Sequence, residues 1–175
     1  MLKKTFNLLI ILLILIICIG CNKKIKEDDL FTYYYDFSYY GFENVHDINL
    51  KASNLDALTD AINNKKTTIF TISSSTCFSC KKEVEILNDI SKCHGFSVYL
   101  IDPYSHLYPL FDEDEQMNKL LDILKPYIKT KDDLEIPLLI IVNDGDIVSC
   151  MLGTHDGDDT LFNKIDKVLK KSNLY

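Results

Sequence analysis

The sequence predicts a domain of the α/β class, with a central mixed β-sheet flanked by helices. Apolar runs of strand length alternate with segments of helical periodicity between residues 45 and 101, an order typical of parallel strands joined by crossover helices. Two further strand-like runs follow, and the turn dipeptide Asp144-Gly145 lies between them, as in an antiparallel hairpin. Because both kinds of pairing are predicted in one chain, the sheet is expected to be mixed.

The first elements of this domain are an aromatic segment, a strand and a helix. Aromatic side chains crowd the range Phe31–Phe42, which is expected to form an N-terminal strand or lid that packs on the domain. A short strand is predicted over Val45–Leu50. The range Ser53–Asp56 matches a capping-box pattern. The residues that follow share one apolar helical face: Leu55, Leu58, Ala61 and Ile62.

The central stretch contains a strand, a bend and the start of a helix. Thr67–Ile72 is β-branched and aromatic, as in a buried strand, and Ser73–Thr76 is a polar bend whose side chains can cap a helix. Helical periodicity begins at Cys77, and the helix is expected to run to about Lys92 and to end at Gly95. Its apolar face is marked by residues at i, i+4 and i+7, which are Cys80, Val84 and Leu87.

The second half of the chain supplies three more strands and two more helices. Pro137 stands immediately before one of these strands, where a proline is tolerated and can be cis. In chain order, the predicted elements are the strand Phe96–Ile101, the helix Asp112–Lys125, the strands Leu138–Val142 and Ile147–Leu152, and the helix Asp158–Lys171.

The pair Cys77-Phe78-Ser79-Cys80 lies where the central strand ends and a helix begins. A thiol at a helix N-terminus faces unpaired N–H groups and the positive end of the helix dipole, which favour the thiolate and lower its pKa. One turn later, the second thiol is close enough to form a disulfide with the first. We therefore expect Cys77 to be the nucleophile and Cys80, on the apolar side of the helix, to be the resolving partner.

The first residues of the chain are not expected to belong to the domain. Two lysines precede an unbroken apolar run, Leu8–Ile19, which has the length of a signal-peptide core and is short for a membrane span. The run ends at Gly20-Cys21 and resembles a bacterial lipoprotein signal, although Cys18 stands where such signals usually carry leucine. The resemblance implies a signal peptide over residues 1–20, a lipidated Cys21 with a tether over residues 21–30, and a domain over residues 31–175. The alternative is an uncleaved signal anchor, and both readings place the domain outside the cytoplasm and attached to the cell membrane.

Net charge and cysteine spacing argue against a nucleic-acid partner and against a metal site. The net charge is −7 over 175 residues, so no nucleic-acid partner is expected. Cys93-His94 invites a zinc interpretation, but a helix would hold Cys93 about 20 Å from Cys80, so no metal site is expected.

Cys150 is expected to be a small apolar residue facing the same side of its strand as Val148 and Leu152. A disulfide between Cys93 and Cys150 remains an alternative.

The order of elements resembles the thioredoxin fold from Val45 to Leu174. The second half carries much of the resemblance, because Ile136-Pro137 and the apolar strand after it are followed by the turn Asn143–Asp146 and by Gly153. This matches the thioredoxin spacing of cis-proline, strand, glycine turn and glycine. The fold that the resemblance implies is a central mixed sheet flanked by helices, with an N-terminal strand or helix extension.

The resemblance also implies roles for matching residues. Cys77 is similar to the exposed attacking thiol and Cys80 to the resolving thiol of a redox-active disulfide. Pro137 is similar to the cis-proline beside that disulfide, and the backbone of Ile136 would pair with an extended substrate, with Phe78 as a second substrate contact. No cofactor is implied beyond the cysteine pair. The implied partners are protein thiols or disulfides and a membrane electron donor.

The chain departs from the reducing thioredoxins at three positions. Phe78-Ser79 replaces their Gly-Pro, Thr76 replaces their tryptophan, and Thr71 stands at the strand position of their buried acid, for which a water or Glu135 would have to substitute. The chain is more similar to the thioredoxin-like proteins of Gram-positive bacteria, some of which are known as bacteriocin transport accessory proteins. The expected function is a membrane-tethered, extracytoplasmic thiol–disulfide oxidoreductase. The alternative is a non-catalytic accessory lipoprotein that binds an exported peptide such as a bacteriocin.

Overall fold

The computed structural model describes residues 30–44, 48–103, 105, 113–128, 135–152 and 158–171. Their centre is a five-stranded sheet in the order β1-β3-β2-β4-β5. The strands β1 (Leu50–Ala52), β3 (Val98–Ile101) and β2 (Thr68–Ile72) are parallel to one another. The strand β4 (Leu138–Asn143) runs antiparallel to β2, and β5 (Asp146–Leu152) runs antiparallel to β4. The mixed α/β sheet expected from the sequence is therefore confirmed.

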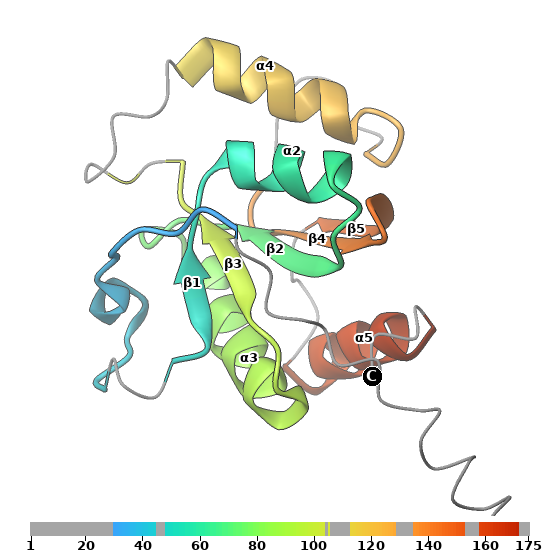
Figure 1. The fold of residues 1–175 in the computed structure, drawn as a ribbon. Helices are drawn as coiled ribbons and strands as arrows, with labels where there is room; N and C mark the ends of the chain where they lie inside the picture. Colours follow the sequence, from blue (N-terminus) through green and yellow to red (C-terminus); the bar gives the residue numbers. More distant parts are fainter. Residues whose placement is uncertain are drawn as a thin grey trace, which may run out of the picture.

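Helices cover both faces of the sheet (Figure 1). The helices α2 (Leu55–Asn63) and α4 (Glu113–Leu124) lie on one face, and α3 (Phe78–His94) and α5 (Asp158–Lys171) lie on the other. Each face buries its own apolar core. The α2-side core includes Leu55, Leu58, Phe70, Ile72 and Leu124, and the α3-side core includes Ile69, Cys80, Val84, Leu87, Leu100, Leu139 and Ile165.

Two local boundaries differ from those expected. The first strand begins at Leu50 instead of Val45, because the amide of Asn49 donates to the side chain of Asn88 and pairing with β3 starts at Leu50. Residues 45–47 lie outside the described ranges. The N-cap of α2 is Asn54, whose side chain accepts from the amide of Ala57 at 3.0 Å. The capping box predicted at Ser53 was therefore wrong, since the hydroxyl of Ser53 donates to the backbone carbonyl of Phe31 instead.

The strand β5 contains a bulge that the alternation of its residues does not reveal. Val142 pairs with Ile147 and Ile141 pairs with Ser149, so Val148 is an extra residue opposite one step of β4. Such an insertion reverses the inward and outward alternation beyond it. Val148 is consequently exposed, whereas Cys150 and Leu152 pack against the α2-side core. The expectation that all three share one side was wrong for Val148.

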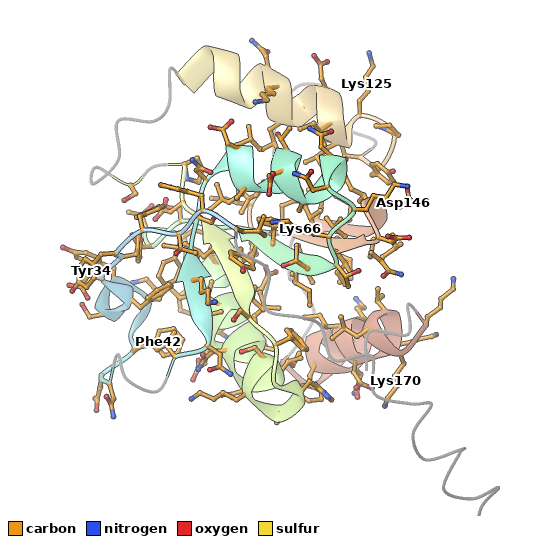
Figure 2. All side chains as sticks on the ribbon, viewed as in Figure 1. Tyr34, Phe42, Lys66, Lys125, Asp146 and Lys170 are labelled. Atoms are coloured by element: carbon orange, nitrogen blue, oxygen red, sulfur yellow. A yellow bond between two sulfur atoms is a disulfide. The ribbon has the colours of Figure 1, made fainter. Side chains whose placement is uncertain are left out.

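An N-terminal strap, Leu30–Gly41, packs beside the sheet. It pairs with the sheet edge through one antiparallel bridge, in which the amide of Tyr33 donates to the carbonyl of Ala52. The hydroxyl of Tyr35 donates to Asp102 at 2.7 Å, and a short 3₁₀ helix, η1 (Phe37–Tyr40), follows. The strap buries Leu30, Tyr35, Phe37 and Tyr40, whereas Tyr34 projects into solvent (Figure 2). The strap matches the expected lid, except that it forms a single bridge in place of a full strand.

The proposed signal peptide, Cys21 and most of the tether fall in residues 1–29, outside the described ranges. In the part of the chain that is described, no helix combines the length and hydrophobicity needed to cross a membrane.

Candidate active site

A disulfide joins Cys77 and Cys80 at the start of α3. Cys77 is the N-cap of this helix, and its sulfur accepts from the amide of Cys80 at 3.3 Å. The hydroxyl of Ser79 lies 3.2 Å from the same sulfur. The polar bend Ser73–Thr76 was expected to supply the cap, but the hydroxyls of Ser74 and Thr76 bond to each other. The sulfur of Cys77 itself therefore accepts a hydrogen bond from an amide at the helix N-terminus, a contact that favours negative charge on a sulfur.

The two sulfurs differ in their access to solvent. Cys77 is partly exposed, whereas Cys80 is completely buried in the α3-side core. Phe78 stands between them with 75% of its surface exposed, and the ammonium of Lys82 lies 5.2 Å from the centre of its ring. An incoming thiol or disulfide can therefore meet Cys77, whereas Cys80 exposes no surface to it.

The peptide Ile136-Pro137 lies at the start of β4, and its bond is cis. Leu138, the next residue, pairs with Ile72, the last residue of β2. Because the bend that leads to Cys77 follows Ile72 directly, this pairing places Ile136-Pro137 and the disulfide at the same end of the sheet. Ile136 and Cys77 both pack against the α3-side core. Four residues that the sequence singled out, Cys77, Cys80, Ile136 and Pro137, therefore lie at the same end of the sheet.

Several solved structures are similar to this chain at low sequence identity. Oxidized thioredoxin O1 from Arabidopsis thaliana shares 12% identity with a TM-score of 0.48, over 70% of this chain and 96% of its own. Thioredoxin from Plasmodium falciparum shares 16% identity with a TM-score of 0.43, over 65% and 93%. Thioredoxin from Trypanosoma brucei brucei shares 12% identity with a TM-score of 0.44, over 68% and 91%. No protein-family model and no curated protein matches the chain.

The topology of the chain itself decides the fold. Three parallel strands and a terminal antiparallel hairpin are arranged in the order β1-β3-β2-β4-β5, and a C-x-x-C disulfide opens the helix that follows β2. The chain has the thioredoxin fold. The resemblance noted in the sequence is therefore confirmed at the level of the fold.

One buried acid of this thioredoxin fold was missed by the sequence reasoning. Glu83 on α3 is only 1% exposed, and its carboxylate accepts from the hydroxyl of Thr71 at 2.8 Å. Burial raises the pKa of Glu83 to about 7, and the bond from Thr71 lowers it by a smaller amount. Glu135, which had been considered as a substitute for the strand acid, is exposed. A signal was present, because Glu83 follows Cys80 by three residues and borders the apolar face of the helix.

The remaining cysteines lie apart from this site. Cys93 is exposed at the end of α3, and Cys150 is half-buried on β5, where burial raises the pKa of its thiol to about 11. Both are free thiols, so the alternative of a Cys93–Cys150 disulfide is contradicted. Within the described residues, His, Cys, Asp and Glu side chains form no group of three or more that could hold a metal ion.

Proposed function

We propose that this protein is a thiol–disulfide oxidoreductase that acts on protein substrates. The observation that carries the proposal is the asymmetry of the disulfide, in which a partly exposed sulfur at a helix N-terminus is bonded to a fully buried one. This asymmetry supports an attacking role for Cys77 and a resolving role for Cys80, since Cys77 is partly exposed and Cys80 is not.

The reaction moves two electrons between the cysteine pair and a substrate. In the reducing direction, the Cys77 thiolate attacks a substrate disulfide, so that a mixed disulfide forms and one substrate thiolate leaves. The Cys80 thiolate then attacks the sulfur of Cys77, which releases the second substrate thiolate and restores the Cys77–Cys80 disulfide. The reverse sequence oxidises a substrate dithiol.

The surroundings of Cys77 favour a polypeptide substrate. The backbone of Ile136, next to Pro137, would pair with an extended segment. Phe78, the residue after Cys77, has an exposed ring, and aromatic side chains are favoured where one protein contacts another.

Redox equilibration of the full chain tests this proposal. We expect the Cys77–Cys80 pair to equilibrate with glutathione or dithiothreitol at a potential between about −120 and −270 mV, the range of catalytic pairs. We also expect the protein to accelerate the reduction of insulin disulfides by dithiothreitol. A Cys77→Ser/Cys80→Ser variant serves as the control and should give the uncatalysed rate. A pair that stays oxidised well below about −300 mV, as structural disulfides do, would contradict catalysis and favour a binding module.

We further propose that Cys21 anchors the protein to the cell membrane through a lipid, with the domain outside the cytoplasm. The support is the sequence pattern of basic residues, apolar run and Gly20-Cys21. Expressed in a bacterium, the wild-type chain should incorporate labelled palmitate and sediment with membranes. The Cys21→Ala variant should lose the label, whereas the Cys18→Ala control should keep it. Equal labelling of both variants would contradict Cys21 as the anchor.

A further inference from the structure

We infer that the strap belongs to the reactive site, in which Tyr35 and Asp102 are positioning residues that hold the bend Ser73–Thr76 and, through it, the sulfur of Cys77. This inference rests on the proposed function and adds to it a segment that precedes the first strand of the sheet. The contacts that carry it run from the strap to the bend and from the bend to Cys77.

The strap attaches to the sheet at its reactive end. Its one bridge joins Tyr33 to Ala52, the last residue of β1. Because β1, β3 and β2 are parallel, their carboxyl ends share one edge of the sheet, and the chain leaves this edge at Ile72 to reach Cys77. The strap adds no strand to the five-stranded sheet. Its packing is therefore directed at the end of the sheet that carries the dithiol.

The bend begins beside the buried side chain of Asp102. Ile72 and Ile101, the last residues of β2 and β3, pair with each other. The amide of Ser73 donates to the carbonyl of Ile101 at 3.0 Å, which continues this pairing by one step. Ser73 and Asp102 are both buried. The start of the bend and Asp102 are therefore held together at the ends of two neighbouring strands.

Tyr35 connects Asp102 to the middle of the bend. Its hydroxyl donates to Oδ2 of Asp102 at 2.7 Å, and the side chain of Ser75 forms a second hydrogen-bond contact with the same hydroxyl. Burial raises the pKa of Tyr35, Asp102 raises it further, and Ser75 lowers it by a smaller amount, so the phenol stays protonated and able to donate. The ring centres of Phe37 and Tyr40 lie 5.1 Å and 6.1 Å from that of Tyr35. Packing therefore fixes the position of the hydroxyl.

The bend in turn determines where Cys77 lies. The amide of Cys77 donates to the carbonyl of Ser74 at 3.1 Å, and the hydroxyls of Ser74 and Thr76 lie 2.9 Å apart. This turn joins the residues held by the strap to the N-cap of α3. A bend that loses its contact with the strap can shift Cys77 relative to the first turn of α3, where the sulfur accepts from the amide of Cys80 at 3.3 Å.

Such a shift should cost the reduced protein more than the oxidised one. In the reduced form, the amide of Cys80 and the helix dipole stabilise a thiolate on Cys77, whereas a disulfide sulfur carries no charge to stabilise. Loss of the Tyr35 hydroxyl should therefore destabilise the reduced state and shift the equilibrium toward the disulfide. The reaction itself is unchanged. The two thiols lose two electrons and two protons to glutathione disulfide, which becomes two molecules of glutathione.

Equilibration of the full chain with glutathione at pH 7 measures this shift. After acid quenching and alkylation, trypsin cleavage after Lys66 and Lys81 gives one peptide that contains both Cys77 and Cys80 and no other cysteine. Mass spectrometry of this peptide gives the fraction of disulfide. In Tyr35→Phe, we expect the equilibrium constant for disulfide formation to rise by about 2- to 10-fold, the size expected when an interaction between a charge and a helix N-terminus weakens.

Tyr34→Phe is the matched control, because Tyr34 precedes Tyr35 in the strap and is 86% exposed. Its equilibrium constant should equal that of the wild type. If Tyr35→Phe gave the same constant as Tyr34→Phe, the inference would be overturned, even with a lower urea midpoint, since the strap would then be only a structural support. A wild-type pair that neither glutathione nor dithiothreitol can reduce would instead refute the proposed function, so the two failures are distinguishable.

Ser75→Ala tests the same link from the side of the bend and does not depend on whether Tyr35→Phe folds. Ser75 is half-buried, and the loss of its hydroxyl should shift the equilibrium constant in the same direction. The double variant Tyr35→Phe/Ser75→Ala should match Tyr35→Phe alone, because both substitutions break one contact. An unchanged constant in Ser75→Ala, or effects that add fully in the double variant, would contradict the route from Tyr35 through the bend to Cys77.

Discussion

Replacement of Cys80 by serine is expected to arrest the protein as a disulfide-linked adduct of Cys77. Cys77 remains able to attack a substrate disulfide, but the adduct can no longer be resolved from within the protein. Intramolecular attack by Cys80 benefits from an effective concentration far above that of any dissolved thiol, since well-oriented groups reach about 10⁵ M or more. We therefore expect turnover of insulin disulfides to fall by at least about 100-fold. The adduct should appear as a higher band on non-reducing gels that disappears with dithiothreitol.

The reciprocal variant tests the order of attack. Cys77→Ser leaves only the buried Cys80 of the pair, so it should show neither turnover nor an adduct through the pair. If Cys77→Ser trapped substrate as well as Cys80→Ser does, the assignment of the attacking sulfur from solvent exposure would be wrong. A Cys93→Ser variant controls for adducts that form through the exposed free thiol.

Replacement of Gly145 by alanine is expected to produce the largest loss of stability among the three described glycines with positive φ. Gly145 adopts φ +85° in the turn between β4 and β5. An added Cβ would lie 2.6 Å from the carbonyl oxygen of Ile62 and 3.0 Å from Cα of Lys65. Both contacts are with backbone atoms, so the hairpin or the end of α2 must shift. We expect a loss of about 2–4 kcal/mol, which exceeds the roughly 1 kcal/mol due to backbone conformation alone.

Gly95 supplies a matched control for that loss. It also has a positive φ, +70°, at the C-cap of α3, but a Cβ there would meet nothing within 4 Å. Gly95→Ala should therefore cost only about 1 kcal/mol. Both values can be measured by urea denaturation followed by far-ultraviolet circular dichroism, which suits a chain without tryptophan. Equal losses in the two variants would show that the contact with α2 is unimportant.

The elements of this fold were predictable where the signal was local. The strand that precedes Cys77 is a continuous β-branched and aromatic run, and its observed range differs from the predicted one by a single residue. The final helix has one apolar face, and its observed range is the predicted one. The cysteine pair was recognisable because its spacing coincides with a change from strand to helical periodicity. Local patterns of this kind are written within a few residues, and they do not depend on how the elements later pack.

Features that depend on packing were not predictable in the same way. The choice of Asn54 over Ser53 as the N-cap depends on the strap. The hydroxyl of Ser53 donates to the carbonyl of Phe31 in the strap, and the side chain of Asn54 accepts from the amide of Ala57. The bulge at Val148 depends on the register with β4. Glu83 looked like one of several charged residues on a helix, and its burial followed only from the contact of that helix turn with Thr71.

The strap also limits the distance between the proposed anchor and the folded domain. Tyr33 and Tyr35 bond the strap to Ala52 and Asp102, and Leu30 is buried. Residues 30–41 are therefore part of the folded domain and not of the proposed tether. If Cys21 is the anchor, as proposed, the tether contains only the residues between Cys21 and Leu30. Nine extended peptide steps span at most about 30 Å, roughly the thickness of the hydrocarbon core of a bilayer. The dithiol would then stay close to the membrane, and its substrates would have to be membrane-bound or to come to the membrane surface.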